Sequence, residues 1–206
     1  MSQRLQVHPL NPQPRLIRQA AELIRKGGLV VYPTDSGYAF GWHIGDRDAA
    51  ERLQRIRQTG KDHNFTLVCR DLSEIATYAR IDNPTYRLLR AHTPGAYTFI
   101  LRATREVPRR LQNPKQQTVG IRVPDHPVPL AVLAELGEPL MSSSLILPDH
   151  ELPLADPDDI HDALAGRIDL LIDSGNCGLD PTTVVDLTSD LPRVLRQGRG
   201  DAGVFA

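Results

Sequence analysis

The sequence predicts an α/β (α+β) fold: a single domain over residues 1–206, with a twisted, open, mixed sheet flanked by helices. Short apolar runs alternate with amphipathic segments along the chain, but without the strict repeat of a βαβ array. The length of 206 residues suits one generous domain. The composition, with 40% hydrophobic and 24% charged residues, is that of an average soluble globular chain. Because only 5% of the residues are aromatic, the core is expected to be aliphatic.

Local patterns place the individual elements. Residues 14–26 are expected to form a helix, because a proline stands in the first turn and Gly27 and Gly28 follow its end. Asp46 is the expected N-cap of a second helix. Further helices are expected over residues 72–78, 86–92 and 128–136 and from Asp156 or Asp158 onward, with a short helix or turn at 107–113. Strands or strand-like apolar runs are expected over residues 4–8, 29–32, 38–44, 65–69, 97–103, 118–123, 140–147, 168–172, 183–187 and 193–196.

The stretch from Gly27 to Trp42 is the first place to look for a ligand site. The apolar run from Leu29 to Tyr32 stops at Pro33, which is typical of a buried strand. Three small oxygen-bearing side chains follow, and then Gly37, which allows a sharp turn or the close approach of a ligand. Ligands of α/β proteins bind beyond the carboxyl ends of the strands. The same residues are typical of an ordinary turn, so the spacing alone leaves both interpretations open.

Charge is distributed unevenly, although the formal net charge is only −1. Six cations lie from Arg102 to Arg122 against a single acid, Glu106, whereas acids dominate residues 149–190. More arginines lie in the second expected helix. If these cations converge on one face, they form a surface that suits the phosphates of a nucleotide or a nucleic acid. The alternative is a set of solvated arginines on separate faces.

Several common catalytic motifs are absent. The sequence has no G-x-x-x-x-G-K-[ST] phosphate loop and no G-x-S-x-G nucleophile elbow. No two histidines have metal-ligand spacing, and none can be assigned to activate the serines at 142–144, so neither a built-in metal site nor a catalytic nucleophile is expected. Cys69 and Cys177 are too few for a disulfide framework. With no apolar signal region or membrane-length run visible, we expect a cytoplasmic protein without a membrane partner.

Six segments carry a resemblance to a known family, and they occur in the family's order over nearly the whole chain. They are GGLVVYPTDSGYAFG, TPGAYTFIL, TVGIRVPDHP, PLMSSSLIL, PTTVVDL and VLRQG. On these segments the chain resembles the YrdC-like proteins, and most closely their YciO branch. The resemblance implies the YrdC-like fold.

The better-known members of that family are threonylcarbamoyl-AMP synthases. They join threonine, bicarbonate and ATP, release pyrophosphate, and make the intermediate for modifying adenosine 37 of tRNA. The resemblance implies chemistry without a protein nucleophile, in which the protein positions its substrates while Mg²⁺ and cationic side chains stabilise the phosphates. It also implies that Thr34 contacts the amino-acid side and that Arg122 pairs with a carboxylate through two hydrogen bonds.

The resemblance further implies contacts to the nucleotide. Thr118 and Ser144 would contact the nucleotide itself. Either Thr182 or Thr183 would form the far wall of the pocket. Arg196 would contact a phosphate or the nucleotide.

Two departures from the family pattern bear on activity. The synthases carry K-x-R where this chain has Arg57, a glutamine and Thr59, and S-x-N where it has Ser144, a leucine and Ile146. Losing two polar phosphate contacts, at about 1.5 to 3 kcal/mol each, weakens ATP binding by more than about a hundredfold. Lys61 and His63 lie near enough in sequence to be candidates for compensating cations.

These observations lead to one expectation and two alternatives. We expect an RNA-associated protein that binds double-stranded RNA or tRNA, and a nucleotide, through a basic concave cavity. The first alternative is a synthase-type enzyme that uses ATP and Mg²⁺. The second is a scaffold whose pocket no longer functions, although a polar set that includes Thr34, Arg122, Ser144 and Arg196 is costly to bury without partners.

Overall fold

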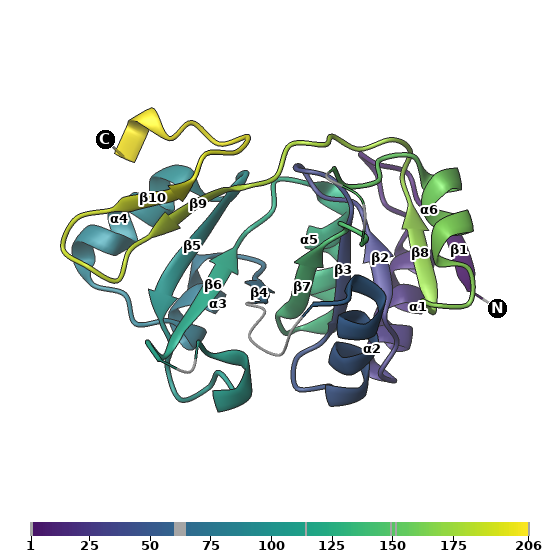
Figure 1. The fold of residues 1–206 in the computed structure, drawn as a ribbon, viewed down its shortest axis with the longest axis horizontal. Helices are drawn as coiled ribbons and strands as arrows, with labels where there is room; N and C mark the ends of the chain where they lie inside the picture. Colours follow the sequence, from purple (N-terminus) through teal and green to yellow (C-terminus); the bar gives the residue numbers. More distant parts are fainter. Residues whose placement is uncertain (1, 60–64, 114, 149, 151, 206) are drawn as a thin grey trace.

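Ten strands form one mixed sheet whose spatial order departs from chain order at most steps. The computed structural model describes residues 2–59, 65–113, 115–148, 150 and 152–205. The sheet order is β1-β8-β2-β3-β7-β4-β6-β5-β9-β10 (Figure 1). The strands are β1 (Gln3–Gln6), β2 (Val30–Tyr32), β3 (Ala39–His43), β4 (Thr66–Val68), β5 (Tyr97–Arg102), β6 (Thr118–Arg122), β7 (Leu140–Ser144), β8 (Leu170–Asp173), β9 (Thr183–Asp186) and β10 (Arg193–Arg196). The expected α/β fold with an open, mixed sheet is confirmed.

Six α-helices are described, together with two short 3₁₀ segments. The helices are α1 (Pro14–Arg25), α2 (Arg47–Arg57), α3 (Leu72–Tyr78), α4 (Asn83–His92), α5 (Pro127–Leu136) and α6 (Pro157–Leu164), and the 3₁₀ segments are η1 (Arg109–Leu111) and η2 (Gly203–Phe205). Asp46 caps α2 as expected, and Asp156 rather than Asp158 caps α6. Helix α4 begins three residues before its expected start, because the Asp82 carboxylate accepts a hydrogen bond from the Thr85 amide and caps it there.

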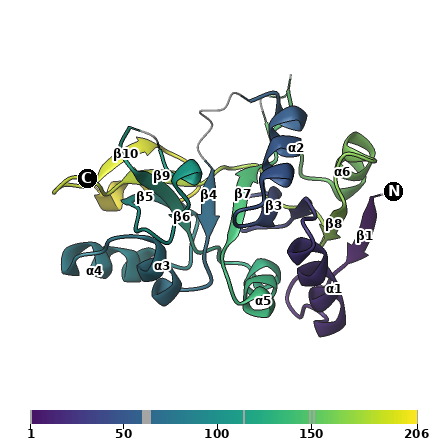
Figure 2. The same ribbon diagram turned by 90° about the horizontal axis from the view of Figure 1, so that it is seen from below.

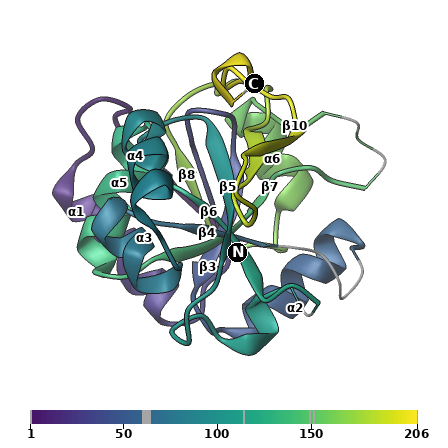
Figure 3. The same cartoon turned by 90° about the vertical axis from the view of Figure 1, so that its left-hand side faces the viewer.

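Helices cover both faces of the sheet, but not along its whole width. Figure 2 shows α1 and α5 on one side of the strands and α2 and α6 on the other, and Figure 3 shows the same separation from the end. Helices α1 and α5 pack in one hydrophobic cluster with strands β2 and β8. Helices α2, α6, α3 and α4 contribute to the other cluster, which holds Phe99 of β5 and Ile121 of β6. In Figures 2 and 3, α3 and α4 appear on the same side of the view as α1 and α5, at the other end of the sheet. Among the described residues, no helix is both long and apolar enough to cross a membrane.

Strand register brings polar residues into one row on the face that α1 and α5 cover only in part. Ser142 of β7 pairs with Thr66 of β4, which pairs with Gly120 of β6. Gly120 in turn pairs with Ile100 of β5, which pairs with Asp186 of β9. Directly paired residues point to the same face of a sheet. The row therefore runs across five strands beyond the helices α1 and α5.

Strand β7 ends earlier than its apolar run predicts. The run continues to residue 147, but the strand ends at Ser144, which pairs with Ala39, the first residue of β3. Past that point β3 has no further residue to pair with β7. The chain leaves the sheet there, and Ile146 comes to lie beside the C-terminal end of α2 through a hydrogen bond to Arg57.

Candidate functional site

A cavity of about 480 Å³ lies on the uncovered part of the sheet. Its floor is built from alternate residues of successive strands, because side chains in a strand point to opposite faces in turn. The end of α2 and the segments after β5 and β7 form the remaining walls. The residues that line it include Arg57, Phe65, Thr66, Thr98, Ile100, Leu111, Asn113, Gln116, Thr118, Gly120, Arg122, Ser142, Ser143, Ser144, Ile146, Thr182, Val184, Asp186, Arg193, Leu195 and Arg196.

Most of the residues singled out from the sequence meet at this cavity. Its lining includes Arg57, Thr118, Arg122, Ser144, Thr182 and Arg196, which come from α2, β6, β7, the start of β9 and β10. Thr34 and Thr183 are buried but do not belong to the lining. Between the two adjacent threonines, strand alternation directs Thr182 toward the cavity and Thr183 to the other face. Lys61 and His63 lie outside the described residues.

Arg122 is held in the cavity by a carboxylate that the sequence interpretation passed over. The guanidinium group of Arg122 donates a hydrogen bond to Asp35, and both side chains are only 10% exposed. The Nε atom of Arg122 is buried and has no hydrogen-bond partner among the described residues. A buried donor of this kind is costly unless a ligand or water satisfies it. The pair is therefore both an anchor for Arg122 and an incomplete binding site.

Thr34 shapes the turn that presents Asp35. Its hydroxyl donates a 2.6 Å hydrogen bond to the Gly37 carbonyl and accepts one of 3.1 Å from the Ser36 amide. Gly37 has φ +118°, and a Cβ atom there would lie 2.8 Å from the carbonyl oxygen of Gly178. Only glycine suits such a position, because it tolerates this φ and allows the close approach. Thr34 thus acts on the site through the turn, and its hydroxyl is already engaged.

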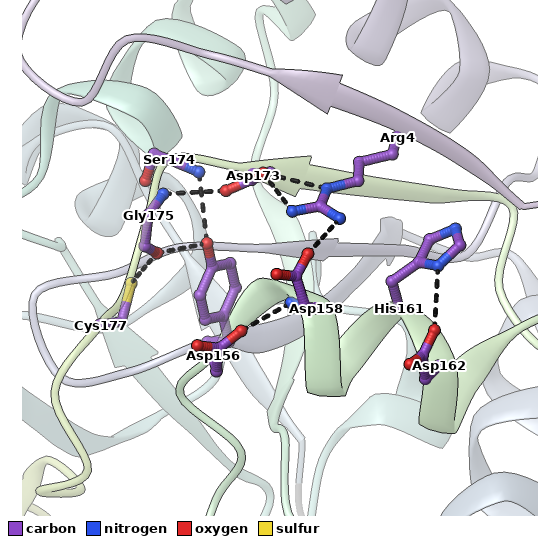
Figure 4. A network of polar contacts seen from close by, with 10 residues as sticks. Arg4, Asp156, Asp158, His161, Asp162, Asp173, Ser174, Gly175 and Cys177 are labelled. Atoms are coloured by element: carbon purple, nitrogen blue, oxygen red, sulfur yellow. Dashed lines mark hydrogen bonds and ion pairs between the residues drawn. The ribbon is translucent and has the colours of Figure 1, made fainter.

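The loop after β8, which approaches this turn at Gly178, is anchored by the network in Figure 4. Arg4 of β1 donates to Asp173 of β8 over 2.8 Å and to Asp158 of α6 over 2.6 Å. The second oxygen of Asp173 accepts the amide of Gly175 over 2.9 Å. The Tyr38 hydroxyl donates to the Gly175 carbonyl over 2.8 Å. The loop after β8 is therefore fixed at its base before it passes the turn that carries Asp35.

Thr183, on the other face of the sheet, has a comparable positioning role. Its hydroxyl accepts the Gly198 amide over 2.9 Å and donates to the Gly200 carbonyl over 2.5 Å. Between these two glycines lies Arg199, whose guanidinium group donates to the Asp35 carbonyl over 2.5 Å. The hydroxyl of Thr183 therefore holds a turn that ties the C-terminal segment to the loop after β2.

Two further arginines line the cavity from opposite walls. Arg57 donates from Nε to the carbonyl of Ile146 over 3.0 Å and also hydrogen bonds to Ser143. Arg196 donates to the Thr182 carbonyl from two nitrogens, over 3.2 and 2.8 Å. Burial lowers the pKa of both guanidinium groups below its ordinary value. Both remain charged, and an anion bound in the cavity would compensate for the hydration that each guanidinium group loses on burial.

Hydroxyl groups continue the polar floor between these walls. Ser142 donates to the Phe40 carbonyl over 2.9 Å, so the Tyr32 hydroxyl, 2.7 Å away, donates to Ser142. The Thr98 and Thr182 hydroxyls lie 2.9 Å apart. Burial raises the pKa of Tyr32 to about 12, and the contact with Ser142 offsets this only in part. Tyr32 is therefore a neutral donor at physiological pH.

A second ion pair at the cavity was also missed by the sequence interpretation. Arg193 of β10 donates to Asp186 of β9 over 3.3 Å, and both line the cavity. Burial raises the pKa of Asp186, but hydrogen bonds from Thr188 and the charge of Arg193 outweigh it and lower the pKa overall. A signal was present, because period-two alternation from Thr182 predicts that Asp186 points to the same face. Within the described ranges, no three His, Cys, Asp or Glu side chains group closely enough to hold a metal ion.

The fold and this cavity define an α/β protein with an arginine- and hydroxyl-lined pocket on a mixed sheet. The chain belongs to the Sua5/YciO/YrdC family, whose model, described as telomere recombination, matches residues 22–198. It is 55% identical to the YciO protein of Escherichia coli K12 over 205 residues, which covers all of both chains. It is 30% identical over 184 residues to the threonylcarbamoyl-AMP synthase of Bacillus subtilis, covering 88% of this chain and 53% of that protein.

Solved structures give the same picture. The crystal structure of E. coli YciO superposes with a TM-score of 0.96 over all of both chains, at 55% identity. The structure of P. abyssi Sua5 complexed with L-threonine superposes with a TM-score of 0.86, at 26% identity, over 95% of this chain and 57% of that one. The expected resemblance to the YciO branch is confirmed, and so is the relation to threonylcarbamoyl-AMP synthases.

The buried pair of Asp35 and Arg122 should be costly to break from one side only. We expect Asp35→Ala to lower the free energy of unfolding by about 3 to 5 kcal/mol, because it leaves a buried guanidinium without its counter-charge. Combining it with Arg122→Met should recover part of that loss. Urea unfolding of the two single variants and the double variant measures the coupling. Arg70→Ala, which breaks the exposed pair with Asp71, should cost less than about 1 kcal/mol. Additive losses at Asp35 and Arg122 would contradict the pairing.

The raised pKa of Tyr32 predicts a loss of stability in alkali. Its pKa in the folded protein is about 12, above the ordinary value of 10, so the unfolded chain loses its proton first. The contribution of Tyr32 is therefore complete below pH 10 and is lost as the pH rises toward 12. Urea unfolding at pH 9, 10 and 11 should show a shallower decline for Tyr32→Phe than for the unmodified protein. Tyr86→Phe, at an exposed tyrosine, should decline like the unmodified protein. Equal slopes for all three proteins would refute the assignment.

Proposed function

We propose that the cavity binds a nucleotide. One observation carries the proposal: guanidinium and hydroxyl groups from five strands and a helix converge on one partly enclosed space of about 480 Å³. This volume lies in the range of small-molecule sites, which combine an apolar lining with a few placed polar groups. The side chains of Phe65, Leu111 and Ile146 offer apolar surface to a base, while the arginines suit its phosphate.

The relatives give this proposal its chemical frame. The B. subtilis relative is a threonylcarbamoyl-AMP synthase, and the P. abyssi structure is a complex with L-threonine. By this analogy Arg122 binds a carboxylate through its unsatisfied Nε, while Thr118, Ser144, Thr182 and Arg196 lie along the nucleotide. ATP, threonine and bicarbonate would then be the substrates of a synthase-type reaction.

The described residues provide no resident Mg²⁺ site beside this nucleotide. Asp186 lines the cavity and is engaged by Arg193, and Asp35 is engaged by the lining residue Arg122. Mg²⁺ binds through carboxylates together with substrate phosphates and retained waters. Any Mg²⁺ in this site would therefore arrive on the phosphates of the nucleotide.

The local structure at Ile146 supports slow synthase turnover. Ile146 lies in the lining, and its carbonyl oxygen binds Arg57. Its side chain cannot supply the amide that the synthases have at this position. The neighbouring cation of the K-x-R pair is replaced by Thr59. Both changes remove polar groups that the synthases carry at or near the end of α2, so we propose nucleotide binding with weak synthase activity.

Nucleotide binding should depend on Arg196. Calorimetric titration with AMP and with ATP should give saturable binding of at least one of them. Arg196→Gln should weaken it about ten- to a hundredfold, the value of one hydrogen bond to a charged group. Arg87→Gln, on the exposed surface of α4, serves as the matched control. Incubation with ATP, threonine and bicarbonate should release pyrophosphate slowly. Absence of binding at millimolar nucleotide would refute the proposal.

A second candidate function is RNA binding, and the distribution of exposed cations favours it. We use the term basic rim for five exposed cations that line the cavity or lie within two residues of its lining. The basic rim consists of Arg55, Arg109, Lys115, Arg193 and Arg196. Cations spread over such a surface suit the phosphates of double-stranded RNA or tRNA, which such proteins recognise by shape.

RNA binding through the basic rim should be strongly salt-dependent. For a 20-base-pair RNA duplex or tRNA, the logarithm of affinity should fall with the logarithm of salt with a slope of about −3.6 to −4.5, as expected for four or five phosphate contacts. Arg109→Glu with Lys115→Glu should reduce affinity at least about tenfold and leave nucleotide binding unchanged. Arg15→Glu with Arg18→Glu, on α1, alters the net charge equally and should bind RNA like the unmodified protein. Equal losses in both double variants would argue against the basic rim.

A further inference from the structure

A second hollow, of about 570 Å³, lies apart from the cavity on the sheet, between the segment that leads into α6 and the loop after β8. We use the term acidic groove for five of its lining residues, which are Leu152, Leu154, Asp156, Asp159 and Leu179. The two walls are joined by their backbones, because the Cys177 amide donates to the Ala155 carbonyl over 3.2 Å. The acidic groove is therefore formed in the folded chain before any partner arrives.

Leucine side chains give the acidic groove an exposed apolar surface. Leu152 is 60% exposed and Leu179 is 42% exposed, and both line the same hollow. A single exposed leucine is ordinary on a protein surface, whereas apolar side chains gathered in one hollow suit an interaction site. A partner that covers these two leucines would remove apolar surface from water.

The charge around these leucines is negative. Asp159 and Asp180, which follows Leu179 in the chain, are exposed and have no ion-pair partner within the described ranges. From residue 149 to residue 190, Arg167 is the only lysine or arginine, and its guanidinium group donates to the Ile56 carbonyl. Such a surface repels the phosphates of nucleic acids and of anionic lipids. The chemistry therefore favours a protein surface on which cations flank an apolar side chain.

Helix α4 carries a surface of this kind. Tyr86 is 45% exposed, and Arg87 and Arg90 are exposed. The three lie on one face of the helix, because residues three and four positions apart are neighbours. In the part of the chain that the structure describes, neither arginine has an ion-pair partner. Tyrosine and arginine are also the residues that most often anchor protein interfaces.

The positions of the two surfaces exclude a contact within one chain. Figures 1 and 2 show α4 and α6 at opposite ends of the molecule. The acidic groove includes Asp159 in the first turn of α6, so the α4 of the same chain lies far from it. A contact between these surfaces therefore needs two copies of the chain, placed head to tail.

From these observations we infer that the acidic groove of one copy binds the exposed face of α4 of a second copy. Tyr86 lies against Leu152 and Leu179, while the two arginines of α4 face the carboxylates. The formal net charge of −1 favours association, because copies with little net charge repel one another only weakly. This contact does not depend on the proposed nucleotide binding.

Sedimentation velocity of the full chain tests the inference. The mean sedimentation coefficient should rise between about 10 µM and about 1 mM protein, because a small, charged interface binds weakly. The rise should continue beyond the dimer, since head-to-tail contacts leave one groove and one α4 face free at the ends. Raising the salt to about 0.5 M should weaken association at least about threefold, because salt screens exposed charges. A protein that stays monomeric at every concentration would overturn the inference and leave the groove to a basic segment of another protein.

Charge reversal identifies the two surfaces. Arg87→Glu with Arg90→Glu should lower the association constant at least about tenfold, and Asp159→Lys with Asp180→Lys should do the same, because each places like charges in contact. All four substitutions together restore opposite charges and leave the net charge at its original value. The combined variant should recover most of the association. Association that persists in both double variants, or that the combined variant does not recover, would overturn the inference.

Two further variants separate this contact from general effects of charge. Arg15→Glu with Arg18→Glu, at exposed positions of α1, changes the net charge as much as the α4 variant and should associate like the unmodified protein. Leu179→Ser should weaken association about three- to tenfold without changing any charge. Circular dichroism of each variant checks that it is folded. An α1 variant as impaired as the α4 variant would also count against the inference.

Discussion

Strand register is the constraint on which the site depends. The pairing of Ser142 with Thr66, and of Thr66 with Gly120, directs these side chains to one face. The same register extends through Ile100 to Asp186. A slip of one residue in any of these pairings would make a strand's polar side chains point into the hydrophobic core. The alternate apolar residues, such as Phe99 and Ile121, already fill that core. Their burial on one face of the sheet therefore determines which residues lie on the cavity face.

An incomplete helical layer leaves the cavity open to ligands. Helices α1 and α5 cover one end of the face that carries the polar row, and helices α3 and α4 contribute to the cluster that holds Phe99 and Ile121 at the other end. Among the described residues, the cavity beyond β7 is bordered by the end of α2, by β10 and by the segments that follow β5 and β7. Loops adapt more readily than helices to a new ligand, whereas the strands beneath them stay rigid. The arrangement combines a precise floor with variable walls.

Two ion pairs lower the net positive charge of the cavity. Without Asp35 and Asp186, four arginines would face a partly dehydrated space and repel one another. The pairs also connect distant segments, since Asp35 lies in the loop after β2 and Asp186 at the end of β9. Arg199 joins the same connection by binding the carbonyl of Asp35. The same contacts therefore balance the charge of the cavity and hold its walls together. A bound ligand must either replace these contacts or add to them.

The sequence by itself determined the elements and much of the polar set. Capping aspartates, prolines and glycines are local signals, so α1 and α3 were predictable to within a residue or two at their ends, and the start of α2 was predictable from its cap. The family resemblance pointed to Thr118, Arg122, Ser144, Arg196 and either Thr182 or Thr183, and its K-x-R pattern pointed to Arg57. The cavity lining includes Arg57, Thr118, Arg122, Ser144, Thr182 and Arg196. Only the tertiary structure decided that Thr34 and Thr183 serve turns instead, and that Asp35 and Asp186 neutralise two arginines. Asp35 and Arg122 meet across 87 positions, and no local pattern encodes such a meeting. Asp186 and Arg193 are seven positions apart, and strand alternation indicated the face of Asp186 but not its partner.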